Sequence, residues 1–472
     1  MITFIISLIA LIGGYFIYGT IVERIFGVNE ANETPAKRLA DGVDYVEMDW
    51  KKAFLIQFLN IAGLGPIFGA VAGALWGPAA FMWIVFGCIF AGATHDYLAG
   101  MLSVRHDGAT IAEVVGKYLG EGARKIMIVF SVVLLVLVGV VFVNGPAGIL
   151  NSLMPSVPTL QWVGIIMVYY IIATLVPVDK LIGKIYPLFG AALIFMGIGI
   201  AVMMFVKGYA VNIPELSLTN IHPKGTGVYP FLFITIACGA ISGFHATQAP
   251  LMARCLKNEK EGRRVFYGSM IAEGIIALIW AAAAMTFFDG GVEGLAVAGP
   301  AGVVVNTISS SMLGKVGGFL ALLGVVACPI TSGDTAFRSA RLALADAAKY
   351  NQGPVKNRLI VALPLFAVGI GLCFMDFGII WRYFAWSNQT LATIALWAGA
   401  VYLAENAKFH WIASIPATFM TAVVTTYIII APEGLKMSTS IGYPVGILAA
   451  VVCIGLFMKK ARSSSVTAQA KI

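Results

Sequence analysis

Long apolar runs separated by short polar stretches dominate this chain. Hydropathy, read in windows of about 19 residues, places thirteen apolar segments along it. Each is close to the roughly 20 residues that a helix needs to cross the hydrocarbon core of a bilayer. The pattern predicts an all-α polytopic membrane protein, with segments near residues 3–21, 53–76, 79–103, 125–151, 160–178, 184–206, 228–252, 264–288, 316–345, 357–375, 378–404, 409–431 and 440–458.

Two stretches between these segments have patterns of their own. Residues 104–124 carry apolar positions at helical spacing, which predicts a short amphipathic helix on the inner membrane surface. Residues 289–315 have room for a re-entrant or surface helix, so the number of spans is open by one.

Composition agrees with a membrane protein. Charged residues occupy 11% of the 472 positions and hydrophobic residues 59%, and the mean hydropathy is +0.89. A soluble domain carries about 25% charged residues, so this chain has too few to solvate a large water-facing domain or to form a nucleic-acid-binding face. We expect membrane lipid around the protein and no nucleic acid partner.

The basic residues predict an orientation. If successive loops lie on alternate sides, 26 of the 31 Lys and Arg residues fall on one side and five on the other. The positive-inside rule then places the N-terminus outside and the C-terminus in the cytoplasm. The first segment has neither a basic n-region nor a small-residue cleavage site, which favours a retained span of a bacterial inner-membrane protein.

Nothing in the sequence indicates enzyme chemistry. There is no Ser-His-Asp order, HExxH motif, P-loop or GxGxxG motif after a strand. We expect a protein that is not an enzyme and has no cofactor or metal. The cysteines lack CxxC spacing and lie in or beside apolar runs, which predicts neither disulfides nor a zinc site; they are Cys88, Cys238, Cys255, Cys328, Cys373 and Cys453.

Two predicted spans are interrupted by small residues and proline, over 60–66 and 237–250. Glycine lowers the cost of leaving helical dihedrals and proline removes a donor, so each break frees backbone groups that are costly in lipid. For either break alone, the alternative is close helix packing, since Gly and Pro are frequent in membrane helices. As a matched pair, the breaks predict two facing kinks at the bilayer centre that form a transporter binding site.

The breaks lie five segments apart, and an odd number of spans inverts the second unit relative to the first. We predict a first repeat over 53–206 and an inverted repeat over 228–404. Residues 1–52 would form an N-terminal helix and cytoplasmic loop, and 409–472 accessory helices and a cytoplasmic tail.

Polar and small residues near the breaks are the candidate substrate ligands. They would form a largely neutral lining. The N-termini of the half-helices, which carry the positive ends of the helix dipoles, would bind a substrate carboxylate there. The predicted substrate residues are Gln57, Asn60, Gly63, Gly65, Asn144, Ser242, Gly243, His245, Thr247 and Gln248.

The ninth segment contains a candidate cation site. Hydroxyls at Thr331 and Ser332, facing carbonyls freed near Ala62 and Gly63, would supply hard oxygen ligands for a small alkali cation, with Asp334 close by. Two alternatives stay open. Asp334 would pair with Arg338 one turn later, and the hydroxyls would bond to the preceding helical turn.

Ionisable side chains at depth are candidates for proton coupling because they are costly in lipid. Glu273 lies near the middle of the eighth segment, and His245 lies within the second predicted break. The alternatives are a neutral Glu273 bonded between helices and a His245 that serves packing. His95 and Asp96 in the third segment favour a structural or gating ion-pair network rather than a substrate contact.

Several longer motifs are ordered along most of the chain: Thr34-Pro35-Ala36, residues 41–46, 61–67, 90–96, 103–106, 236–245 and 385–392. They resemble the carbon starvation protein CstA family. The resemblance implies a LeuT-like fold of five plus five inverted segments, within the amino acid-polyamine-organocation superfamily, with one extra N-terminal and about two extra C-terminal helices. It also implies uptake of peptides or, in some members, of pyruvate, which is proton-driven in pyruvate-transporting relatives.

The resemblance assigns the family's acid to Glu273 and its Ser-Gly-Phe-His motif to Ser242 to His245. The chain departs from many members before the first break, where Ile56-Gln57 and Asn60 replace a His-His pair and a serine. We therefore expect a secondary active importer of peptides or a small carboxylate, coupled to H⁺ or Na⁺ by alternating access. The alternatives are a channel or a nutrient-sensing receptor on the same fold.

Overall fold

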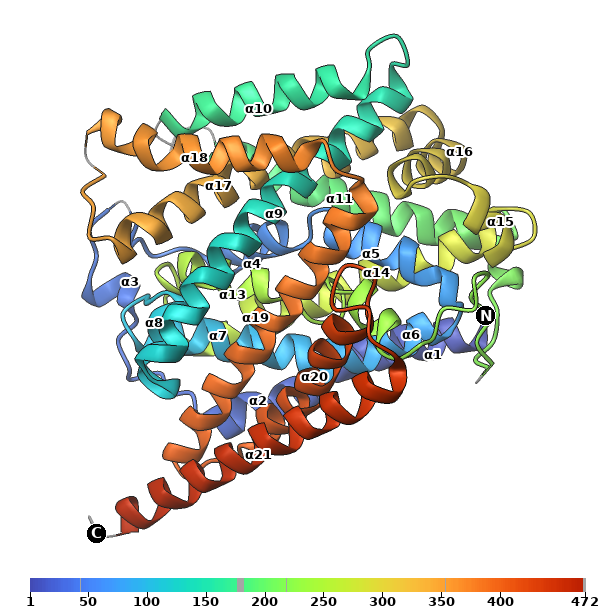
Figure 1. The fold of residues 1–472 in the computed structure, drawn as a ribbon. Coiled ribbons are helices and arrows are strands. Elements are labelled where there is room, and N and C mark those ends of the chain that lie inside the picture. Colours follow the sequence, from blue (N-terminus) through green and yellow to red (C-terminus); the bar gives the residue numbers. More distant parts are fainter. Residues whose placement is uncertain (43, 176–181, 218, 353, 470–472) are drawn as a thin grey trace.

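The computed structural model describes residues 1–42, 44–175, 182–217, 219–352 and 354–469, which are almost entirely helical (Figure 1). The α-helices are α1 (Ile2–Phe16), α2 (Tyr18–Phe26), α3 (Pro35–Arg38), α4 (Trp50–Ile61), α5 (Gly65–Gly73), α6 (Ala79–Phe86), α7 (Ala93–Arg105), α8 (Ile111–Leu119), α9 (Glu121–Leu153), α10 (Thr159–Leu175), α11 (Ile182–Val206), α12 (Phe231–Thr235), α13 (Gly243–Ala253), α14 (Gly268–Phe287), α15 (Val292–Val297), α16 (Ala301–Ala321), α17 (Cys328–Ala347), α18 (Val355–Cys373), α19 (Phe377–Glu405), α20 (Trp411–Ile430) and α21 (Thr439–Gln469).

Short 3₁₀ and π turns join several of these helices. The first three are η1 (Ala74–Trp76), η2 (Gly87–Gly92) and η4 (Tyr209–Asn212). The others are η5 (Glu259–Glu261), η6 (Arg263–Tyr267) and η7 (Leu322–Ala327).

Helices occupy every segment that hydropathy predicts, although residues 176–178 of the fifth segment lie outside the described residues. Within the described chain, nine helices are long and apolar enough to cross a membrane, and the bent pair α4 and α5 makes a tenth. The protein is therefore a multi-pass membrane protein. The count of thirteen spans and the orientation stay predictions.

The stretch 289–315 forms α15 and the first part of α16. Gly314, at φ 60° and ψ −145°, interrupts α16, and this positive φ is a conformation that favours glycine. The helix after Gly314 continues through η7 into α17, which matches the predicted segment 316–345. The expected amphipathic helix within 104–124 is α8, which begins with a capping box between Thr110 and Glu113.

The helices around the two breaks pack in reciprocal fashion. Helix α5, after the first break, packs on α14, and α13, after the second break, packs on α7. At the centre, α9 and α17 run along each other. Each break thus rests on a helix of the other predicted repeat, as an inverted arrangement requires, while the boundaries 53–206 and 228–404 stay predictions.

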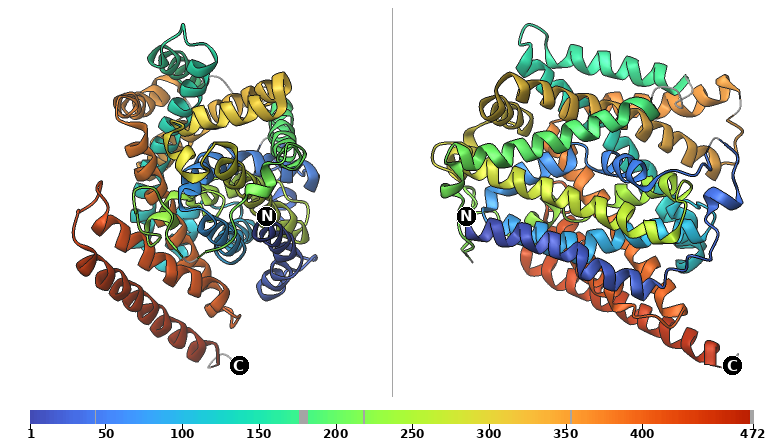
Figure 2. Two further views of the ribbon diagram at one scale, coloured as in Figure 1. Left: turned by 90° about the vertical axis from the view of Figure 1, so that its right-hand side faces the viewer. Right: turned by 180° about the vertical axis from the view of Figure 1, so that it is seen from behind.

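Accessory helices flank this core. Helix α1 lies along α14 and α6, α2 contacts η6, η2 and α7, and α20 and α21 pack on α19 (Figure 2). The two termini lie at opposite ends of the bundle in Figure 1 and in the right view of Figure 2.

Candidate functional site

The first break is short. Helix α4 ends at Ile61, Ala62 leaves helical dihedrals at φ −85° and ψ 43°, and α5 begins at Gly65. Pro66 follows in the first turn of α5, where its missing N–H costs nothing. The two helices are bent by 50°, so the irregular backbone spans Ala62 to Leu64, less than the predicted 60–66.

The second break is longer and lies earlier than predicted. Residues 236–242 connect α12 to α13 without regular helix, and Gly239 has φ +87°. The expectation that 237–250 leaves regular helix is wrong in its second half, because α13 is helical from Gly243 onward. Pro250 falls within α13, where the last turn accommodates it.

The two breaks touch each other. A Cβ atom built on Gly65 would lie 2.4 Å from the Cys238 Sγ, and one built on Gly239 would lie 3.8 Å from Pro66. Both values refer to buried residues from different predicted repeats. The close approach needs the small residues, and it brings the two irregular stretches face to face inside the protein.

Side chains of α19 hold the second break. The Asn388 Oδ1 accepts a hydrogen bond from the Phe244 backbone N–H at 2.7 Å, and its Nδ2 donates to the Ser242 Oγ at 3.0 Å. The Gln389 Nε2 donates to the carbonyl of Phe233 at the end of α12. These bonds satisfy backbone groups that the break releases.

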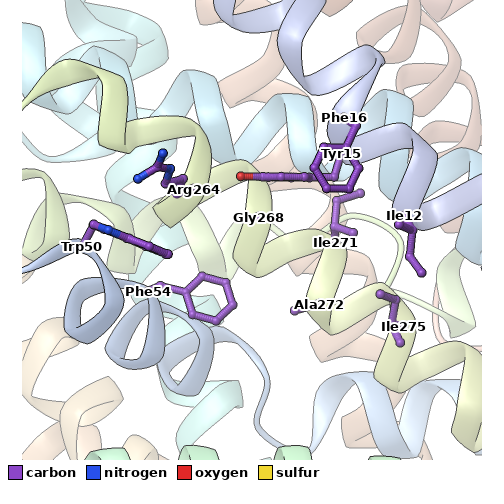
Figure 3. Close-up of a pocket in the computed structure, with 10 residues that line it drawn as sticks. All are labelled: Ile12, Tyr15, Phe16, Trp50, Phe54, Arg264, Gly268, Ile271, Ala272 and Ile275. Carbon is purple, nitrogen blue, oxygen red and sulfur yellow. The ribbon is translucent and has the colours of Figure 1, made fainter. Parts of the chain in front are cut away.

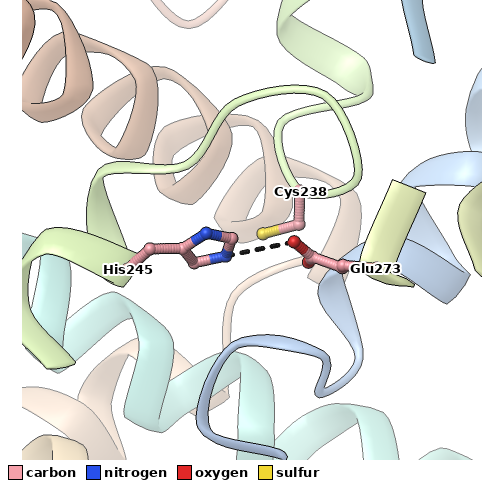
Figure 4. A group of neighbouring side chains, drawn as sticks. All are labelled: Cys238, His245 and Glu273. Carbon is pink, nitrogen blue, oxygen red and sulfur yellow. Dashed lines mark ion pairs between the residues drawn. The ribbon is translucent and has the colours of Figure 1, made fainter. Parts of the chain in front are cut away.

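A chain of four buried ionisable side chains passes beside the breaks. The Asp96 carboxylate contacts the Nδ1 of His95 and the Nδ1 of His245, each at 2.8 Å. The His245 Nε2 lies 3.4 Å from the Glu273 carboxylate (Figure 4). All four side chains are at most 1% exposed. Two acids and two imidazoles therefore share one water-excluded region formed by α7, α13 and α14.

Cys238 extends this group toward the first break. Its Sγ, the His245 ring nitrogen and a Glu273 oxygen all lie within 4.8 Å of one another. Thiolate, imidazole and carboxylate are ligand types that zinc accepts. The imidazole and the carboxylate are already in contact, so we interpret the group as part of the ionisable chain.

The predicted substrate residues occupy two different regions. Gln57 is fully buried in α4, where α4 packs on α13, whereas Asn60 is half-buried. Thr247 donates to the Phe244 carbonyl and accepts from Gln248, so both side chains are engaged on α13. Gly63, Gly65, Ser242, Gly243 and His245 all lie at the two breaks.

Asn144 lies apart from these residues, in a cavity of about 500 Å³. The cavity is lined by α9, α16, the end of α18 and the start of α19, and Phe68 of α5 forms part of its wall. The Asn144 Oδ1 is buried and accepts no hydrogen bond from the described residues. The cavity therefore approaches the first break from the side to which α5 points.

The candidate cation residues on α17 are partly engaged elsewhere. The Thr331 hydroxyl donates to the Cys328 carbonyl at 2.7 Å, and Ser332 is buried beside the Cys328 thiol. Asp334 pairs with Arg338 at 3.7 Å and accepts from the Tyr169 hydroxyl at 3.3 Å. Both alternatives to cation binding, back-bonding and pairing, are thus present. A sodium site with Ala62 and Gly63 stays a prediction.

Sequence reasoning missed two members of the site. The sequence favours a structural or gating network for Asp96, yet its carboxylate contacts His245 directly. Asn388 carried no predicted role, although it fixes the second break. The available signal was the same for both: a polar side chain deep inside an otherwise apolar span.

Comparison with solved structures identifies the fold. A mutant of the manganese transporter of Eremococcus coleocola superimposes with a TM-score of 0.57 at 14% identity, covering 90% of this chain and 99% of that one. MhsT in complex with L-phenylalanine gives a TM-score of 0.54 at 15% identity, covering 91% of this chain and 100% of MhsT. The protein has the LeuT-like transporter fold that the sequence predicts.

Sequence comparison finds named transporters among the relatives. An uncharacterized membrane protein of Haemophilus influenzae is 45% identical over 340 residues, 61% of this chain and 92% of its own. The peptide transporter CstA of Escherichia coli is 26% identical over 551 residues, 87% of this chain and 78% of its own. The pyruvate/proton symporter BtsT of the same organism is 29% identical over 324 residues, 55% of this chain and 45% of its own.

The model of the carbon starvation protein CstA family matches residues 1–158, 150–311 and 281–427, nearly the whole chain. The matched ranges contain both breaks and all four ionisable side chains. The chain therefore belongs to the carbon starvation protein CstA family and is a secondary transporter, not an enzyme.

Proposed function

We propose that this protein imports a small carboxylate or a peptide together with a proton, by alternating access, across the bacterial inner membrane, with its N-terminus outside. The observation that carries the proposal is the buried chain of His95, Asp96, His245 and Glu273 beside the contact between the two breaks. In this proposal the four side chains carry the proton and the two breaks bind the substrate, and His245 supports both roles because it contacts Asp96 and Glu273 and lies next to the second break.

The charge balance among these four side chains would couple substrate binding to proton uptake. Two acids and two imidazoles with no access to water resist any change in net charge, since an uncompensated buried charge costs several kcal/mol. An anionic substrate that arrives at the adjoining breaks adds one negative charge. Uptake of one proton by His245 or Glu273 restores the balance, so substrate and proton would travel together.

The proposed substrate class is supported by the names of the relatives and by the volume of the cavity beside Asn144. The Escherichia coli relatives are named for peptide transport and for pyruvate/proton symport. The cavity beside Phe68 and Asn144, of about 500 Å³, is of the size typical for small-molecule sites. Protons are favoured over sodium as the coupling ion because Thr331 and Asp334 are already engaged within α17 and α10.

Reconstituted protein tests the coupling. Uptake of labelled pyruvate and of a labelled dipeptide is measured in proteoliposomes with an imposed proton gradient, a sodium gradient or none. We expect Glu273→Gln to retain substrate exchange without a gradient but to lose accumulation against a gradient, because the amide cannot release a proton. Glu293→Gln, in the exposed helix α15, is the matched control and keeps both activities.

Three results would contradict the proposal. Equal loss of exchange and accumulation in Glu273→Gln would indicate a structural role for the acid. Accumulation driven by sodium alone would transfer the coupling to the cation residues. Substrate binding with no uptake in the unmodified protein would favour the nutrient-sensing receptor.

A further inference from the structure

A groove on the outer wall of the bundle lies between α1, α4 and α14 (Figure 3). It has a volume of about 310 Å³. Most of its lining is apolar, and its walls are formed by Ile12, Tyr15, Phe16, Trp50, Phe54, Arg264, Gly268, Ile271, Ala272 and Ile275. Because α1 is outside the two predicted repeats, the groove is a seam between an accessory helix and the transport core.

One end of the groove is cationic. Arg264 and Trp50 lie at one end of the lining, and Ile12 and Ile275 lie toward the other (Figure 3). The Arg264 guanidinium carbon lies 4.8 Å from the centre of the Trp50 ring, and the Lys51 ammonium lies 5.9 Å from the same centre. Among the described residues, no carboxylate pairs with Arg264.

The neighbouring residue, Arg263, differs from Arg264 because it is paired with a carboxylate. Arg263 packs over Tyr15 at 5.2 Å, but its Nε lies 3.0 Å from the Glu23 carboxylate. Arg264 has the same kind of aromatic support without such a carboxylate. The Arg264 guanidinium is exposed at the mouth of the apolar groove and is available to bind an anionic ligand.

We propose that the groove binds a glycerophospholipid with an anionic head group. The lipid phosphate would contact Arg264 beside Trp50, and one acyl chain would lie against Ile12, Ile271 and Ile275. Basic sites between membrane helices recognise anionic lipid head groups in this way, and Trp and Tyr favour the level of the head groups. The apolar part of the groove and its cationic end match the two halves of such a lipid.

Occupation of the groove would reach the ionisable chain through α14. Gly268, Ile271, Ala272 and Ile275 recur at spacings of three and four residues, so they form one face of this helix. Glu273 points from another face toward His245. A lipid in the groove would therefore press on the back of the helix that presents Glu273.

Native mass spectrometry of protein extracted from nanodiscs tests the site. The nanodiscs contain equal amounts of phosphatidylglycerol and phosphatidylcholine, and the phospholipids retained per protein are counted. We expect the unmodified protein to retain phosphatidylglycerol preferentially. Arg264→Gln should weaken that preference about fivefold, the loss of one favourable basic contact.

Ala272→Phe tests the acyl-chain part of the groove. The larger side chain fills the space between α1 and α14, so retention of either lipid should fall while Arg264 is intact. Lys125→Gln, an exposed basic residue at the start of α9, is the matched control and should leave both lipids unchanged. The proposal is overturned if Arg264→Gln behaves as Lys125→Gln does, or if Ala272→Phe retains both lipids as the unmodified protein does.

Discussion

Asp96 illustrates how much one buried side chain can determine. It contacts Nδ1 of both His95 and His245, so the tautomer of each ring that places a proton on Nδ1 is favoured. The His245 Nε2 is then the acceptor that faces Glu273, which can donate only when it is protonated. In the proposed mechanism, a change in the proton state of Glu273 would therefore reach the second break through His245.

Asn388 is the residue whose loss should destabilise the second break most directly. Asn388→Ala leaves the Phe244 N–H and the Ser242 hydroxyl without their partner in a buried region. A buried donor without an acceptor costs about 1–3 kcal/mol, so we expect a lower midpoint of thermal unfolding in detergent and reduced uptake. Thr390→Ala removes only a bond within α19 and should have a smaller effect. Equal effects of the two variants would contradict this assignment.

His106, outside the apolar spans, should give a local pH response. Burial and the nearby Lys117 hold the pKa of His106 below its usual value, against the opposing effect of Asp107. The His106 Nδ1 accepts from Lys117 and its Nε2 contacts the Tyr118 hydroxyl. Folding lowers the pKa of His106, so neutral His106 contributes to the stability of the folded state. This contribution is present above the unfolded pKa of about 6.5 and is lost as the pH falls below it, through the lower folded pKa.

Hydrogen exchange of the segment 107–119 measures this response. The amide exchange rates are corrected for their intrinsic dependence on pH. As the pH is lowered from about 7 to about 5, the corrected rates should rise in the unmodified protein, since protonated His106 cannot accept a hydrogen bond from Lys117. The same segment in His106→Gln should show a much smaller change with pH. An equally large change in the variant would assign the response to another group.

At the scale of elements, the two short breaks are positioned by what surrounds them. The first is set locally by Ala62, Gly63 and Pro66, whereas the second is ended by Asn388 from a distant helix. The positive φ of Gly239 and the close approach of Gly65 to Cys238 allow the two stretches to meet. Alternating access on this fold would require this contact to be remade as the helices move.

Gly65→Ala should separate the breaks. The added Cβ would lie 2.4 Å from the Cys238 Sγ, too close for any real contact, and overpacking of this kind costs about 1–3 kcal/mol. We expect uptake to fall strongly and the thermal midpoint to decrease. Gly164→Ala in α10, where no atom lies within 4 Å of the added Cβ, should leave both properties near those of the unmodified protein. Full uptake by Gly65→Ala would show that the contact is not needed.

At the scale of the whole molecule, the Arg105 guanidinium connects four parts of the polypeptide through hydrogen bonds. It lies at the end of the bundle opposite the cavity beside Asn144. Arg105, at the end of α7, pairs with both oxygens of Glu259 at 3.0 and 3.1 Å. It also donates to the Tyr402 hydroxyl on α19 and to the Gly27 carbonyl after α2. This cross-connection ties the accessory N-terminal helices to both predicted repeats.

Arg105→Gln should loosen this end of the protein. We expect Cys238, as the one remaining cysteine after replacement of the other five, to react severalfold faster with a small maleimide than it does with Arg105 intact. The matched control is Arg124→Gln, which removes an exposed pair with Glu121 inside α9. Unchanged labelling in Arg105→Gln would show that other contacts close this end.

The sequence by itself determined the apolar segments, the existence of two breaks and the presence of ionisable side chains, Glu273 and His245, deep inside the bundle. Lipid makes every exposed backbone group and every buried charge costly, so these features stand out in a pattern that is otherwise uniformly apolar. The spacing of the breaks predicted two inverted five-segment units, the resemblance to the CstA family implied the LeuT-like fold, and the structural comparison confirms that fold.

Only the tertiary structure decided which polar groups meet. Asp96 and His245 are 149 residues apart, and Asn388 lies 144 residues from the Phe244 N–H that it accepts from. The local pattern shows that each is polar and deep but not which partner satisfies it. The length of the second break was likewise decided in three dimensions: the sequence alone favoured irregular backbone to Pro250, but α13 is helical from Gly243 because a side chain from another helix caps its first turn.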